Sequence, residues 1–148
     1  MPQPKPKNKE ITKYKKFIET LTIQSLRILS LDVSVEENFH PPAVIIKEEK
    51  KRFEKIDNKT FKVYHEYNIN GKKQKDEKIK LKIRVVYLIT YHSEVSISEK
   101  FFSLLGNSSL YLHTWPYLRE LVQEITTRMG LPPLILKPMF VKHSKLQK

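Results

Sequence analysis

The chain has 148 residues, of which 39% are apolar, so it is long enough to form one domain with a hydrophobic core. It carries 28 Lys and Arg residues against 16 Asp and Glu, a formal net charge of +12, and it contains no Cys. This composition excludes a disulfide scaffold, thiolate metal sites and Cys nucleophiles, and it is too apolar for a disordered chain. The basic excess suits an anionic partner, but it is mostly Lys and equally suits a solubilising surface.

The N-terminal ten residues alternate Pro with Lys and offer nothing to bury. We therefore predict a flexible basic arm over 1–10, one folded domain over 11–138 and a basic tail over 139–148. The arm lacks the apolar stretch of a signal peptide or anchor, and no apolar run approaches the roughly 18 residues that span a bilayer. These features predict a cytoplasmic protein.

A helix and then a strand follow the arm. Apolar residues recur at helical spacing over 11–21, and from Leu29 to Val35 they alternate with polar ones. Leu26 and Ile28 have the opposite parity, so the apolar face changes at Ile28 and Leu29. A β-bulge at this point keeps both sets on one face of a sheet.

The next segments favour a crossing loop and two more strands. Pro41 and Pro42 cannot donate to a strand ladder, so they predict the loop. A strand is then predicted from Val44, although part of this segment would also suit a helix, and another over 60–69. The Asn70–Gly71 pair predicts a turn after it.

A long fourth strand is predicted over 79–91, because one parity is apolar throughout. Its other parity begins with Lys and Arg and becomes apolar at Val86 and Leu88. A strand that is apolar on both faces is covered by a second layer or lies in a subunit interface.

Two helices are predicted to close the domain. Ser98 is suited to cap the first, which Gly106 ends; Thr114 is suited to cap the second, which Gly130 ends in a left-handed conformation. The second helix has one apolar stripe, which we expect to pack on the sheet or across an oligomer interface. The stripe comprises Leu118, Leu121, Val122, Ile125 and Met129.

The stretch after this helix, "LPPLILKP", is apolar but is interrupted by proline. It can form neither a helix nor a central strand that would bury its side chains. Exposed apolar surface of this kind usually belongs to an interface, with Leu134 and Leu136 as its main contributors.

These C-terminal residues carry a resemblance to a known family. "WPYLRELVQEITTRMGLPPLILKP" resembles the helix and following loop of SecB-type export chaperones, including the SecB-like branch that works with toxin–antitoxin pairs. "LDVSVEENF" resembles the first strand of that family and the start of its crossover loop. The order of four strands and then a helix also matches, and the likeness extends over about 21–138.

The resemblance implies an α+β fold, with a four-stranded antiparallel sheet, a bulged first strand, a crossover loop and a C-terminal helix. It implies a tetramer built from two dimers. Members of this family hold unfolded polypeptides or preproteins in apolar grooves, without ATP, cofactor or enzymatic chemistry. The partners it implies are therefore unfolded chains, together with SecA or an antitoxin.

The resemblance also suggests individual residues. The positions that match the client groove are Val44, Ile46, Trp115, Tyr117, Leu134 and Leu136, and the acidic positions that match a SecA contact are Asp32 and Glu36. From the residues alone, Trp115 and Tyr117 also suit the core, and Asp32 and Glu36 also suit a solvated strand face. The export members are strongly acidic, whereas this chain is basic.

Other chemistries have less support. The five His residues show no paired spacing, so no metal site is predicted, and neither a phosphate-binding Gly loop nor a nucleophile beside a base is present in the sequence. We therefore predict no enzymatic activity and no cofactor. The alternative function is binding of nucleic acid, with Tyr14, Tyr64 and Tyr67 as stacking candidates. The Lys-rich arm also suits anionic lipid, acidic clients or ribosomes.

Overall fold

The computed structural model describes residues 6–40, 43–73 and 78–138. The predicted tail over 139–148, the first half of the predicted arm and the Pro41–Pro42 pair lie outside these ranges. The elements in chain order are α1 (Pro6–Glu19), β1 (Thr22–Val35), β2 (Val44–Lys55), β3 (Thr60–Lys72), β4 (Leu81–His92), α2 (Glu99–Gly106) and α3 (Ser109–Arg128).

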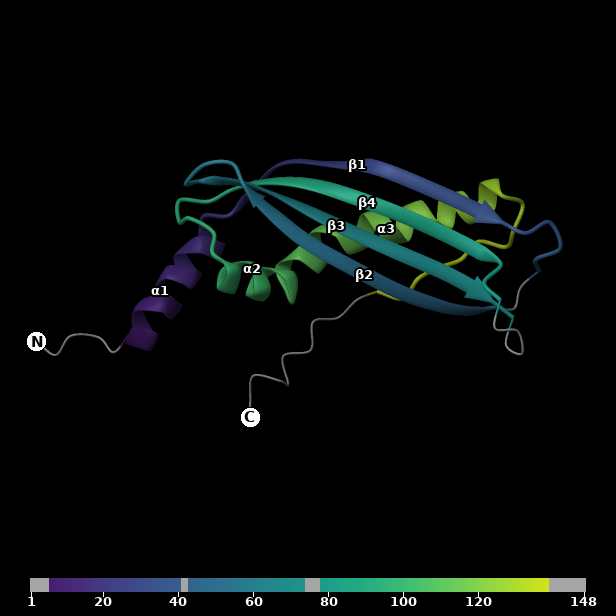
Figure 1. Cartoon of the computed structure of the whole chain (residues 1–148), viewed down its shortest axis with the longest axis horizontal. Coiled ribbons are helices and arrows are strands. Elements are labelled where there is room, and N and C mark those ends of the chain that lie inside the picture. The colour runs from purple at the N-terminus through teal and green to yellow at the C-terminus, as the bar shows by residue number, and fades with distance from the viewer. Residues whose placement is uncertain (1–5, 41–42, 74–77, 139–148) are drawn as a thin grey trace, which may run out of the picture.

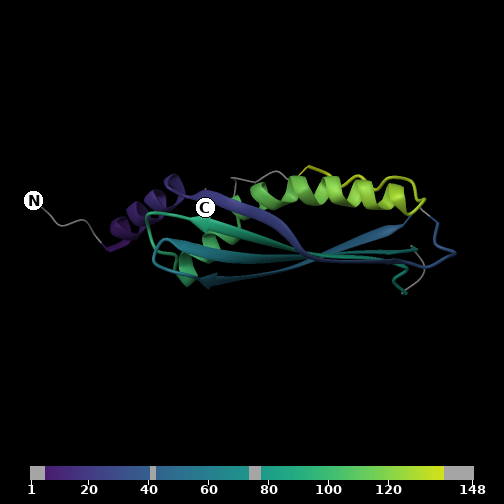
Figure 2. The same cartoon turned by 90° about the horizontal axis from the view of Figure 1, so that it is seen from above.

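The strands form one antiparallel sheet in the order β1-β4-β3-β2, so β1 and β2 are its edges. Helix α3 lies along one face of this sheet, which we call the helix face, and the opposite face is the outer face (Figures 1 and 2). The chain thus has the predicted α+β fold with a four-stranded antiparallel sheet. Strand β2, for which the sequence also suited a helix, is fully extended.

The bulge predicted in the first strand is confirmed. Ile28 pairs with Tyr87 and Ser30 pairs with Val86, so Leu29 is the extra residue. The apolar residues before and after it consequently remain on the helix face. A second register shift lies between Ile23 and Ser25, and the sequence pattern did not reveal it.

The predicted turn at Asn70 and Gly71 is wrong, because both residues belong to β3. Gly71 pairs with Ile45 and Leu81 on the helix face, and a Cβ placed on it would lie 3.2 Å from the Cβ of Leu81. This glycine therefore permits close packing between strands. Strand β4 begins at Leu81, two residues later than predicted.

The hydrophobic core lies between the helix face and the helices. Alternate residues of β3 and β4 are buried there, and α3 contributes Leu118 and Val122. Phe17 of α1 stacks on Phe61 of β3 and packs against Phe101 of α2. These rings connect α1 and α2 to the sheet, at the end of the sheet where the two helices lie (Figure 1).

The helix ends agree with the sequence in part. Helix α1 begins at Pro6, inside the stretch predicted to be an arm, since Pro suits the first turn of a helix. The Ser98 hydroxyl accepts a hydrogen bond from the Phe101 amide, as expected for the cap of α2. The expected cap at Thr114 is wrong: α3 begins at Ser109, and Pro116 lies inside it.

Candidate functional site

An apolar groove of about 130 Å³ opens between the crossover loop, the start of β2 and the end of α3. Its lining residues are Phe39, Ala43, Ile45, Leu81, Thr126, Leu131, Pro132, Pro133 and Leu134. All of these except Thr126 are apolar, and the Thr126 hydroxyl is occupied by hydrogen bonds to α3 and to the following segment. Such a lining offers contact to apolar side chains and makes no demand on their sequence.

The wall of the groove begins where α3 ends. Gly130 adopts φ 77°, and its amide donates to the carbonyl of Thr127 while the Leu131 amide donates to the carbonyl of Thr126. This pair of bonds is a Schellman motif, which reverses the chain after the helix. The two prolines that follow keep the chain extended.

The segment 131–138, which we call the strap, runs back along α3 in the opposite direction (Figure 2). Three side chains of α3 bind its backbone: Thr126 accepts from the Leu134 amide at 2.9 Å, Arg119 Nε donates to the Leu136 carbonyl at 2.8 Å, and Trp115 Nε1 donates to the Lys137 carbonyl at 2.9 Å. Leu134 and Leu136 pack on the core, whereas Ile135 between them is 64% exposed.

The predicted groove residues divide into two groups. Leu134 lines the groove, and Leu136 packs beside it in the strap. Trp115 is buried, with Lys47 Nζ 4.4 Å from the ring centroid, so it supports the strap from below. Tyr117 is 54% exposed on α3 and is not part of the lining.

The start of β2 contributes a residue to the groove other than the two that were predicted. Ile45 pairs with Gly71 on the helix face and lines the groove, whereas Val44 and Ile46 point to the outer face. Strand alternation places neighbours on opposite faces, so a match by position that is shifted by one residue selects the wrong face. The shared parity of Ile45 and Phe53 is the sequence feature that marks the helix face.

Other lining residues were missed for a different reason. Phe39 and Ala43 come from the crossover loop, and Leu81 comes from β4, so no short motif links them. Only the fold brings them to the end of α3.

The acidic residues predicted to contact a motor protein lie beside cations. Asp32 projects from the outer face of β1, with its carboxylate 3.5 Å from Arg84. Glu36 follows β1 and lies 3.0 Å from Lys78 Nζ. Neither carboxylate faces the groove.

The residues predicted to pack on the sheet or in an interface occupy two places. Leu118 and Val122 are fully buried on the helix face, where Leu121, Ile125 and Met129 pack around them. Val86 and Leu88 are buried to 9% and 5% exposure on the outer face, covered by neighbouring strand residues.

A chain of polar contacts between β2, β3 and α3 was not identified from the sequence. Glu49 Oε2 lies 2.9 Å from His65 Nε2, His65 Nδ1 lies 3.1 Å from Thr114 Oγ1, and that oxygen lies 2.8 Å from the Tyr67 hydroxyl. His65 and Thr114 have no solvent exposure, and burial lowers the pKa of His65 despite the adjacent carboxylate. This chain connects β2 and β3 to α3, and Glu49, whose side chain is 22% exposed, is its end nearest the solvent.

The described residues include no group of three or more His, Cys, Asp or Glu side chains that could hold a metal ion. None of the helices in the described ranges combines the length and apolar content that crossing a bilayer requires. The three tyrosines considered for base stacking do not share a face: Tyr14 packs between helices, Tyr67 is buried, and Tyr64 lies on the outer face.

No family model and no curated protein matches this sequence. The fold, however, superimposes on the SecB-like chaperone Rv1957 of Mycobacterium tuberculosis, solved in complex with a ChAD peptide from the antitoxin HigA1. The TM-score is 0.75 at 17% identity, over 87% of this chain and 97% of that one.

The chain has a SecB-like fold. A second solved structure, a protein of unknown function from Streptococcus agalactiae, matches with a TM-score of 0.51 and 13% identity, over 80% of this chain and 97% of that one.

Proposed function

We propose that this protein is an ATP-independent chaperone that holds unfolded or nascent polypeptides by contact and without chemistry. The groove between the crossover loop, Ile45 and the strap is the observation on which this proposal rests. The solved SecB-like neighbour, which holds an antitoxin peptide, supports a polypeptide ligand. Delivery of the held chain to export, or protection of a dedicated partner such as an antitoxin, is the role that follows.

The surroundings of the groove suit an extended client. Strand β2 is an edge of the sheet, so its outward N–H and C=O groups are available to a further strand beside the groove. The apolar lining then receives alternate side chains of that strand. Backbone pairing is independent of sequence, as a holdase for many clients requires.

The strap demonstrates that α3 binds extended apolar chain. Its backbone groups are bound by side chains of Trp115, Arg119 and Thr126, while Leu134 and Leu136 provide the apolar contact. Backbone hydrogen bonds and alternating apolar side chains are the two elements that we propose for client binding.

The first experiment is a fluorescence-anisotropy titration with a labelled, permanently unfolded polypeptide at 50 and 200 mM salt, with duplex DNA as competitor. Binding in an apolar groove persists at the higher salt and is unaffected by DNA. Binding through about six phosphates would fall by roughly 10³ over this range, and such a loss would favour the nucleic-acid alternative.

A matched pair of variants locates the site. Ile45→Asn places an amide in the groove, and Ile46→Asn makes the same change one residue later on the outer face. We expect Ile45→Asn to weaken client binding about tenfold or more, because a desolvated amide lacks a partner in the groove, while Ile46→Asn retains affinity. Equal affinities for the two variants would place the client elsewhere.

A further inference from the structure

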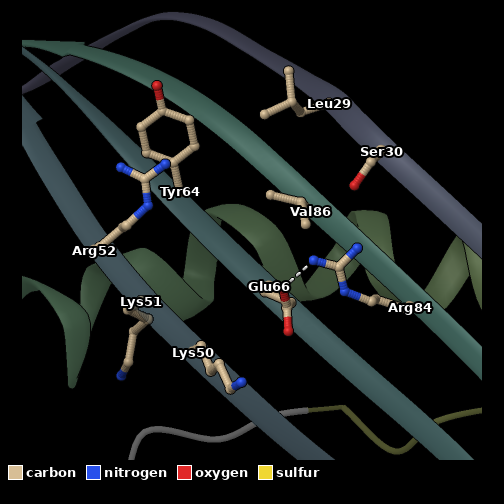
Figure 3. A pocket seen from close by; sticks show the side chains of 9 residues that line it. All are labelled: Leu29, Ser30, Lys50, Lys51, Arg52, Tyr64, Glu66, Arg84 and Val86. Carbon is tan, nitrogen blue, oxygen red and sulfur yellow. Dashed lines mark hydrogen bonds and ion pairs between the residues drawn. The ribbon is translucent and has the colours of Figure 1, made fainter.

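The outer face of the sheet carries a second hollow, of about 360 Å³, on the opposite side from the client groove (Figure 3). The bulge creates it, because the extra residue Leu29 lies on this face beside Val86. Leu29, which is 48% exposed, and the largely buried Val86 form an apolar floor that none of the described helices covers (Figure 3). Lys50, Arg52, Arg84 and the carboxylate of Glu66 surround it.

The cations around this floor differ in their partners. Arg84 binds Glu66 at 2.6 Å and lies 3.5 Å from Asp32, so its charge is compensated. Among the described strand residues, the other cations of this face have no carboxylate oxygen within 4 Å, although Lys50 lies opposite Glu66 and contributes to the lowered pKa of that carboxyl. They are Arg27, Lys50, Arg52, Lys62, Lys72 and Lys82.

The strand register places the charges in rows across the sheet. One row runs from Arg27 through Leu88 and Tyr64 to Arg52, with a cation at each end; Leu88 is buried, and the Arg52 guanidinium covers the Tyr64 ring. The adjacent row runs from the bulge through Val86 and Glu66 to Lys50. An extended segment across these rows would meet exposed apolar contact at Leu29 and positive charge from Arg27, Arg52 and Lys50.

We propose that the outer face is a docking site for an acidic polypeptide segment that carries an apolar side chain between its carboxylates. The apolar side chain enters the hollow over Leu29 and Val86. The flanking carboxylates pair with Arg52, Lys50 and Arg27.

The aromatic content of this face favours a polypeptide over a nucleic acid. Base stacking requires a free ring, but the guanidinium of Arg52 covers the Tyr64 ring at 3.7 Å from its centroid. The apolar floor of the hollow also suits an aliphatic or aromatic side chain better than a phosphate. The charge complements a carboxylate-rich segment.

The test uses two fluorescein-labelled peptides: one with Glu and Asp around a central Leu, the other with Gln and Asn in their place. The acidic peptide should bind the full-length protein with anisotropy that falls with salt, and the amide peptide should not. Arg52→Glu should lower the affinity about tenfold, because it replaces an attraction by a repulsion on an exposed face. Leu29→Ser should weaken binding of the acidic peptide with central Leu, but not binding of an acidic peptide with Ala in place of that Leu.

Lys15→Glu is the matched control, since it makes the same charge change at an exposed position of α1. Equal losses in Lys15→Glu and Arg52→Glu would overturn the proposal, because the charge would then act without a site. Equal binding of the amide peptide would also overturn it. If a single-stranded RNA displaces the acidic peptide, and Arg52→Glu also weakens binding of that RNA, the face would be reassigned to nucleic acid.

Two further measurements separate this proposal from the client groove and from misfolding. Ile45→Asn should leave acidic-peptide binding unchanged, because the groove is on the other face. Lys50→Glu repeats the charge reversal on the same rim of the hollow, so an unfolded Arg52→Glu variant does not remove the test. Unchanged affinity in folded Arg52→Glu and Lys50→Glu proteins would refute the site.

Discussion

Thr114 joins the sheet to α3 through its hydroxyl. Thr114→Val keeps the shape of the side chain but leaves the Tyr67 hydroxyl and His65 Nδ1 without this partner. Both groups are buried, so we expect a loss of about 1–3 kcal/mol in the free energy of unfolding, measured by urea titration. Thr127→Val, on the exposed side of the same helix, should cost less than about 0.5 kcal/mol. Equal losses would show that the chain of hydrogen bonds adds nothing.

The protonation state of that chain follows from its geometry. A Glu49 carboxylate accepts from Nε2–H of His65, so a neutral ring accepts at Nδ1 from the Thr114 hydroxyl. Thr114 Oγ1 also lies 3.1 Å from the Leu110 carbonyl, and its single proton serves one of the two acceptors. Protonation of the ring turns that proton toward Leu110 and leaves a buried cation.

This arrangement predicts loss of stability in acid. Burial lowers the pKa of His65, outweighing the opposing effect of Glu49, with Lys51 and Lys47 acting in the same direction as burial. Below about pH 6.5 the unfolded chain therefore binds a proton that the folded chain does not, and stability falls as pH decreases. Burial lowers the pKa of His113 as well and adds to the same slope.

Measured as the free energy of unfolding between pH 7.5 and pH 5, the pH dependence should be smaller in His65→Gln than in the native protein. His40→Gln, at an exposed position, serves as the control and should retain the native slope. A native slope in His65→Gln would contradict the assignment of acid sensitivity to this ring.

At the scale of elements, periodicity predicted the strands and the faces of β3 and β4 because burial imposes a period of two, whereas Leu29, Val44 and Ile46 lie on the outer face instead of the predicted one. The change of parity at Ile28 and Leu29 revealed the bulge for the same reason. Residues whose roles depend on distant partners were misassigned. Gly71 was interpreted as a turn residue, yet it lies within β3, where the absence of a Cβ permits close packing against Leu81. Thr114 was interpreted as a helix cap, yet its hydroxyl contacts β3.

The junction between α3 and the strap depends on one glycine. Gly130→Ala meets no atom within 4 Å, but φ 77° strains a residue with a Cβ, so we expect a loss of about 1 kcal/mol in the free energy of unfolding. Gly106→Ala is the control, because an added Cβ makes ordinary contact with Lys51 at the end of α2. Thermal or urea unfolding measures the stability of the two variants. Equal stability of Gly130→Ala and Gly106→Ala would mean that the left-handed conformation of Gly130 does not contribute to the stability of this junction.

For the whole molecule, the two faces of the sheet have different chemistry. The helix face contains the apolar groove, and the outer face contains a small apolar floor surrounded mainly by cations. The sequence indicated the chemistry of "LPPLIL" and the basic excess, but it did not indicate how they are distributed. That distribution depends on strand register and on a crossover loop whose side chains meet residues about 90 positions later.

Part of the helix face remains uncovered at the edge strand β1. Ile23, Ile28 and Leu31 pair with buried residues of β4 and share their face, yet each is exposed. An apolar row beside a sheet edge is typical of a subunit interface. We propose that a second copy of the chain covers this row, in keeping with the oligomer that the family resemblance implies.

The bulge supplies a matched pair to test this interface. Ile28 is 43% exposed on the helix face and Leu29 is 48% exposed on the outer face. Ile28→Lys would bury an unpaired ammonium in the interface, so we expect light scattering after size exclusion to show a smaller species than the native oligomer. Leu29→Lys should keep the native mass. A monomeric native protein at tens of micromolar would contradict the interface. Identical masses for all three proteins would also contradict it, because a lysine on the helix face would then have no more effect than a lysine on the outer face.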